Sequence, residues 1–62
     1  MDHDRIEAMK NTLRRCTTVA EVNAAARLLG KDVQAMSEHP TWAVYAIHIR
    51  NLAAVKRLTL EE

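Results

Sequence analysis

The residue that most suggests chemistry is Cys16, which follows Arg14 and Arg15 in the segment LRRCTTVAEV. A thiolate is favoured by neighbouring cations and by a helix N-terminus. The arginines meet the first condition, but the spacing of apolar residues places Cys16 at the end of a helix, where the dipole disfavours an anion. We therefore expect the thiol to pack in a core, with a reactive or intermolecular thiol as the alternative.

The histidines and acidic residues do not form a pattern that a metal site or a catalytic mechanism requires. Zinc sites need clustered ligands at short spacings, whereas this chain has one cysteine and three separate histidines, His3, His39 and His48. None of the eight acidic residues pairs with a histidine or a nucleophile at a catalytic spacing. The sequence predicts no catalytic residue, no metal and no cofactor, so we expect a protein that is not an enzyme.

Size and charge limit the possible functions further. The 62 residues predict a single helical domain over 1–62, and a chain of this length buries only about 60% of its unfolded surface. One cysteine cannot form an internal disulfide, so association with another chain is the favoured source of extra stability. The formal net charge of +1 provides no global attraction to nucleic acid. Without a leader or membrane-span pattern, we expect a cytoplasmic protein that binds no membrane and no small-molecule substrate.

Three helical patterns predict an all-α fold, either a small three-helix bundle or helical hairpins with short turns. In the first pattern, Asp4 and Glu7 have the spacing of a reciprocal helix cap, so this helix is expected to start near Asp4. Its apolar residues alternate at spacings of three and four, which predicts one buried stripe. They are Ile6, Met9, Leu13 and Cys16.

The second pattern begins at Thr18, which forms a capping box with Glu21 and predicts a helix over about 18–37. Its register continues across Gly30, which favours one helix despite a cost of roughly 1 kcal/mol for an internal glycine. The alternative is a break at Gly30 and a short helix from Asp32. The predicted core positions are Val19, Val22, Ala26, Leu29, Val33 and Met36.

Pro40 predicts a turn over 37–39 and a final helix from about Pro40 to Leu58, because proline suits the first turn of a helix and moves His39 out of helical geometry. This helix carries two apolar stripes on different sides, with Arg50 and Arg57 in the narrow polar strip that remains. The first stripe is Trp42, Tyr45, Ile49 and Leu52. The second stripe is Val44, Ile47, Val55 and Leu58.

Two stripes exceed what two neighbouring helices can cover, so the second predicts a homodimer or partner surface. Asn51 lies inside it, where a buried amide can fix register and association state; the alternative is a solvent-facing side chain.

Trp42 and Tyr45 are expected in the core, with a stacking surface as the alternative. His48 lies between the stripes as an interface residue or a pH-sensitive contact. The predicted partner-binding residues are Val44, Ile47, Asn51, Val55 and Leu58.

Nucleic-acid binding is the alternative function. A modest basic patch is possible where the first two helices meet, formed by Arg14, Arg15, Arg27 and Lys31. The segment from Ala26 to Gly30 has the alanine-to-glycine spacing of a helix-turn-helix. However, Asp32 and Glu38 lie in the part that would read DNA, where they would repel phosphates.

The run LRRCTT, followed by Val19 and Val22, resembles the Hha/YmoA family of small nucleoid-associated modulators. The later segment YAIHIRNLAAV is loosely similar to another part of that family. The resemblance implies a short, all-helical, non-enzymatic partner of the H-NS silencing protein, and therefore a role in transcription regulation. The layout would also suit a phage-encoded accessory protein. The prediction from the residues is a protein-binding modulator that acts by occupying a partner's surface.

Overall fold

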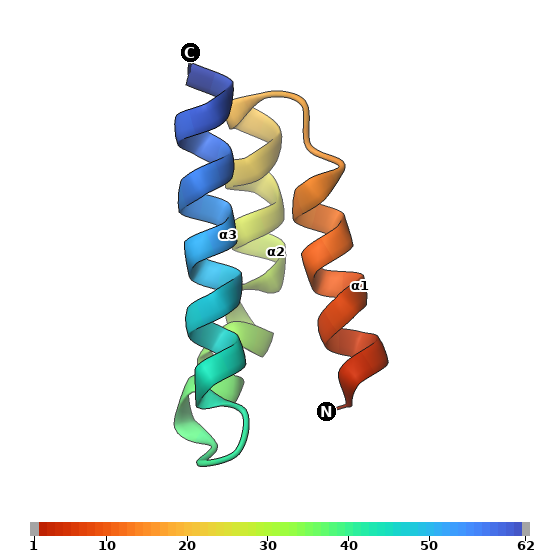
Figure 1. Ribbon diagram of the computed structural model, residues 1–62, viewed down its shortest axis with the longest axis vertical. Coiled ribbons are helices and arrows are strands. Elements are labelled where there is room, and N and C mark those ends of the chain that lie inside the picture. The colour runs from red at the N-terminus through yellow and green to blue at the C-terminus, as the bar shows by residue number, and fades with distance from the viewer. Residues whose placement is uncertain (1, 62) are drawn as a thin grey trace.

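The computed structural model describes residues 2–61, so Met1 and Glu62, the two ends of the predicted domain, lie outside the described residues. Within 2–61 the chain forms three α-helices, which are α1 (His3–Arg14), α2 (Val19–Glu38) and α3 (Ala43–Glu61). The helices run up, down and up, with α3 beside both of the others (Figure 1). The predicted all-α three-helix bundle is confirmed.

Capping side chains fix the starts of α1 and α2. Asp2 is the N-cap of α1, because its carboxylate accepts a hydrogen bond of 2.8 Å from the backbone N–H of Arg5. The predicted cap at Asp4 is wrong, since Asp4 lies within the first turn, where its charge still faces the positive end of the dipole. The cap of α2 is as predicted, because the Thr18 hydroxyl accepts from the backbone N–H of Glu21 at 3.1 Å.

The α2 helix continues through Gly30, which confirms the prediction of one unbroken helix. A Cβ added at Gly30 would meet no neighbouring atom within 4 Å. We expect Gly30→Ala to raise the free energy of unfolding by about 0.5–1 kcal/mol, because alanine loses less backbone entropy than glycine in a helix. Urea unfolding followed by circular dichroism measures this change.

The exposed residue Ala24 on the same helix is the matched control for Gly30. The variant Ala24→Gly should lower the free energy of unfolding by a similar amount. If Gly30→Ala proved neutral or destabilising while Ala24→Gly behaved as expected, the space around Gly30 would be smaller than described.

Pro40 ends α2 as predicted, with His39 in extended geometry at φ −96° and ψ 127°. The connecting turn nevertheless differs from the prediction, because the third helix spans 43–61 rather than 40–58. In the turn, the backbone N–H of Thr41 donates to Nδ1 of the His39 ring at 3.1 Å. The His39 carbonyl also accepts from two backbone N–H groups further on. These bonds hold a turn over 39–42 rather than the predicted 37–39, because Ser37 and Glu38 remain in α2.

The core lies where one face of each helix meets the other two. The predicted stripe of α1 is buried in full, and α2 buries Ala25 in place of Ala26, which is half-buried together with Val19. The buried residues are Ile6, Met9, Leu13, Cys16, Val22, Ala25, Leu29, Val33, Met36, Ala46, Ile49 and Ala53. Half-buried Trp42, Tyr45, Leu52 and Leu60 pack against this core.

The side of α3 that the sequence predicts to be a polar strip faces α2 instead. Ala46 and Ala53 on this side are buried, and Nε of Arg57 donates to Oδ1 of Asn23 on α2 at 2.7 Å. Small alanine side chains let the two helices approach closely, while the long arginine side chain reaches past them to a polar partner. Most of this side of α3 is therefore a packing surface, while Arg50 on it stays exposed.

Polar contacts connect each pair of helices. Besides the bond from Arg57 to α2, Arg5 at the start of α1 pairs with Asp32 late in α2 at 2.9 Å. Lys56 of α3 donates to the backbone carbonyl of Arg14 at 3.0 Å, where its charge complements the negative end of α1. Exposed contacts of this kind contribute at most about 1 kcal/mol each, so burial of the core provides most of the stability.

Candidate functional site

The main exposed apolar surface of the described chain runs along α3. We call it the α3 face, made of Val44, Ile47, Asn51, Val55 and Leu58. The exposed fractions of its apolar residues are 49% for Val44, 53% for Ile47, 58% for Val55 and 65% for Leu58. As predicted from the sequence, neither α1 nor α2 covers this second stripe.

The geometry of α3 explains why this face stays open. Ala46, Ile49 and Ala53 point into the core, and at 100° per residue Ile47 and Asn51 lie on the opposite side of the helix. Figure 1 shows α2 behind α3 and α1 to one side of it, so a third side has no helix against it. From Val44 to Leu58 the face is about 21 Å long at 1.5 Å per residue.

The α3 face is nonpolar apart from one central amide. Its apolar side chains end in methyl groups, and Asn51 at the centre is exposed and uncharged. His48 lies at its edge, exposed, with its ring 6.0 Å from the ring of Tyr45. Covering a surface of this composition lowers the free energy, because apolar side chains are removed from water. The amide at its centre can make a directional hydrogen bond.

The aromatic residues form a separate cluster at the opposite end of the bundle from the α1–α2 loop. The ring of His3 at the start of α1 lies 5.5 Å from that of Trp42 and 5.6 Å from that of Tyr45. Trp42 and Tyr45 are themselves 5.5 Å apart and half-buried against the core. The predicted core role of both residues is therefore supported, and the cluster joins the start of α1 to α3.

Cys16 follows Arg15, the C-cap residue of α1, and is a buried, free cysteine. Its Sγ donates a hydrogen bond of 3.3 Å to the backbone carbonyl of Thr12. Arg14 and Arg15 beside it are exposed. The packing role expected for the thiol agrees with this position.

Glu21 links the α1–α2 loop to the start of α2. Its carboxylate accepts from the hydroxyl of Thr17 at 2.7 Å and from the Thr17 backbone N–H at 3.1 Å. These two bonds, with smaller effects from Thr18, hold the pKa of Glu21 below its ordinary value of 4.5. The folded chain therefore loses this proton more readily than the unfolded chain.

The lowered pKa of Glu21 predicts a contribution to stability that depends on pH. Because the unfolded chain binds the proton first as the pH falls, the contribution is complete above about pH 5 and is lost as the pH falls through the folded pKa. Glu21→Gln should thus be less stable than the unmodified protein at neutral pH, and the difference should shrink in acid. Urea unfolding at a series of pH values checks this; a constant difference would show that the carboxylate charge is not involved.

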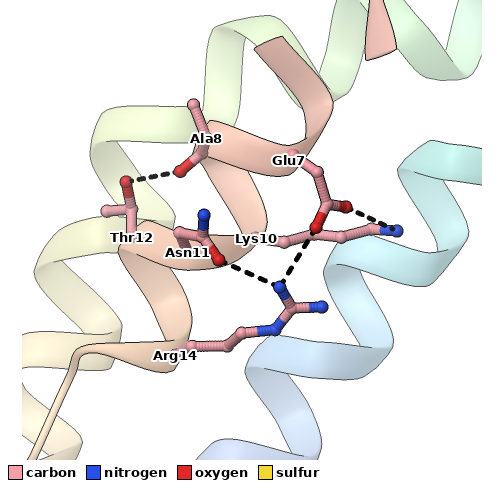
Figure 2. A network of polar contacts seen from close by, with 6 residues as sticks. All are labelled: Glu7, Ala8, Lys10, Asn11, Thr12 and Arg14. Carbon is pink, nitrogen blue, oxygen red and sulfur yellow. Dashed lines mark hydrogen bonds and ion pairs between the residues drawn. The ribbon is translucent and has the colours of Figure 1, made fainter. Parts of the chain in front are cut away.

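The four basic residues of the alternative nucleic-acid surface lie at different levels of the bundle. Arg14 Nη1 contacts Oδ1 of Asn11 at 2.9 Å and Oε1 of Glu7 at 3.3 Å, in a network that also includes Lys10 (Figure 2). Arg5 pairs with Asp32, so the level of Arg5 on α1 is also that of Lys31 on α2. Arg14 lies nine residues further along α1, which is about 14 Å. Arg14 and Arg15 are therefore near the start of α2, whereas Arg27 and Lys31 lie further along it.

Two surface features are not predicted from the sequence. Leu28 on α2 is 78% exposed, although it lies next to buried Leu29. A groove of about 260 Å³ also runs between α2 and α3. It passes over Ala26, Gly30 and Ala53, and Arg50 and Arg57 line it as well. Because its lining residues come from different helices, the groove exists only in the packed structure.

Comparison of the chain with protein-family models, with curated protein sequences and with solved structures finds no match. None of the helices described is both long and apolar enough to cross a membrane. Within residues 2–61, no three His, Cys, Asp or Glu side chains are grouped so that they could hold a metal ion.

Proposed function

We propose that this protein is a small non-enzymatic modulator that binds another protein chain through the α3 face and acts by occupying that surface. The observation that carries the proposal is the exposure of Val44, Ile47, Val55 and Leu58 on one side of α3. Contiguous apolar surfaces of this kind are typical of sites that bind proteins. A bundle this small buries a low fraction of its surface, so covering one more helix face would add to its stability.

The size of the face indicates the strength of binding that it supports. Burying the exposed half of each of its four aliphatic side chains contributes roughly 1 kcal/mol per side chain. The resulting ~4 kcal/mol is partly offset by the entropy of association, so further contacts around the edge must add to it. The face is therefore suited to reversible association rather than to a permanent complex.

Site-specific photo-crosslinking in the source cells tests the proposal. A photoreactive amino acid at Ile47 should give a discrete protein adduct, because this position lies at the middle of the face. The same group at Ala35, an exposed position on α2, is the control and should give none. If Ile47 gave no protein adduct under any growth condition, or if both positions gave the same adducts, the proposal would be wrong.

The same experiment separates protein binding from nucleic-acid binding. An adduct that persists after nuclease treatment comes from a protein contact, whereas nucleic-acid binding through Arg14, Arg15, Arg27 and Lys31 would be sensitive to nuclease and to salt. The regulatory setting implied by the Hha/YmoA resemblance stays a prediction that the identity of the adduct would test.

A further inference from the structure

We propose that the occupant of the α3 face is a second copy of this chain, packed antiparallel to the first about a two-fold axis at Asn51. The inference rests on the proposed function and names the partner of the same surface. It is supported by the spacing of the face residues, by the central amide and by the distribution of charge on α3.

The spacing of the face residues is the same in both chain directions. From Val44 to Leu58 the steps are three, four, four and three residues, with Asn51 at the middle. In an antiparallel pair centred on Asn51, Val44 of one copy lies at the level of Leu58 of the other. Ile47 likewise lies at the level of Val55. Each aliphatic side chain therefore meets another aliphatic side chain, as a two-fold interface requires.

Asn51 then lies on the symmetry axis, where the two copies of its side chain meet. A carboxamide both donates and accepts hydrogen bonds, so two of them can satisfy each other across the axis. Any shift of one helix along the other would bury each amide against aliphatic side chains without a partner, which is unfavourable. A single asparagine in an apolar helix interface fixes register in this way.

The positive charges of α3 lie away from the face. Arg57 is bonded to Asn23 on α2, and Lys56 is bonded to the end of α1. Arg50 lines the groove on the α2 side of the helix. The face residues themselves carry no charge, so two copies can approach without repulsion between like charges. The antiparallel arrangement also places the positive end of each α3 dipole near the negative end of the other.

Complementary charge substitutions test both the association and its direction. Ile47→Asp and Val55→Lys are each expected to weaken self-association at least about tenfold, because every dimer contains the substitution twice and each places a charge in an apolar contact. In an equimolar mixture of the two variants, an antiparallel pair brings the new carboxylate of one chain to the level of the new ammonium group of the other. The remaining Val55 and Ile47 then form a native contact, so sedimentation equilibrium should show a restored dimer.

Two controls define what would overturn the inference. The variant Leu28→Asp adds a charge at an exposed leucine outside the face and should leave association unchanged. A mixture of Ile47→Asp with Ile47→Lys should stay monomeric, since residue 47 does not face itself in an antiparallel pair. Rescue by this second mixture in place of the first would show parallel packing and overturn the inference.

The outcomes also separate this inference from the proposed function. If the unmodified chain is monomeric at submillimolar concentration while Ile47 crosslinks to a different protein, the second-copy inference is wrong and the protein-binding function stands. If the chain is monomeric and Ile47 yields no protein adduct, both are wrong. Circular dichroism of each variant confirms that the exposed substitutions leave the helices folded.

Discussion

The double variant Ile47→Asp/Val55→Asp is expected to fold normally and to lose association through α3. Both side chains are more than half exposed in the single chain, so two carboxylates there remain hydrated and cost little in the monomer. In a covered interface each carboxylate would lose its water without gaining a cation. We expect at least a hundredfold loss of affinity, which corresponds to about 2.7 kcal/mol.

Light scattering and affinity capture of the tagged protein measure this loss, with circular dichroism as the test of folding. Leu28→Asp is again the matched control, because it places the same charge on an exposed leucine of α2. A folded double variant that associated and captured partners as well as the unmodified protein would show that α3 is not the contact surface.

The variant Leu13→Ala is expected to unfold most of the isolated chain. Leu13 is 1% exposed and lies in the core between α1 and the other helices. Truncating a buried leucine to alanine typically costs about 2–5 kcal/mol. A core in a chain below about 70 residues rarely supplies more than about 3–5 kcal/mol in total. The loss is therefore comparable with the whole stability of the domain.

Circular dichroism in the far ultraviolet during urea unfolding checks this prediction. Leu28→Ala removes the same atoms from a leucine that is 78% exposed and should change the free energy of unfolding by less than about 0.5 kcal/mol. Equal effects of the two leucine variants would contradict the described burial of α1.

Helix periodicity is sufficient to predict the bundle and most of its core. The stripe of Ile6, Met9 and Leu13 follows from spacings of three and four alone, and the cap at Thr18 follows from the residue three places later. The cap at Asp2 is not predicted, because Glu7 three places after Asp4 favours Asp4 as a capping box, whereas Arg5 stands three places after Asp2. In the structure Asp2 caps the helix with its carboxylate alone, through the backbone N–H of Arg5.

The exposed face is also predictable, because an all-round apolar helix cannot be covered by two neighbours. The side of α3 that contacts α2 is not, since alanine and arginine resemble a solvated strip in the sequence. Their role depends on close approach of two helices and on the reach of Arg57 to Asn23, which lies 34 positions away. Contacts of this kind follow from three-dimensional packing rather than from any local pattern.

The δ1 methyl groups of isoleucine provide the most direct test of the central claim that another copy covers the α3 face. The chain has three isoleucines, of which Ile6 and Ile49 are buried and Ile47 is exposed. In methyl NMR spectra with a soluble paramagnetic agent, Ile47 should be broadened in dilute protein and become protected as the concentration rises. Ile6 and Ile49 should stay protected throughout. An Ile47 methyl that remained equally accessible from dilute to submillimolar protein would contradict the account.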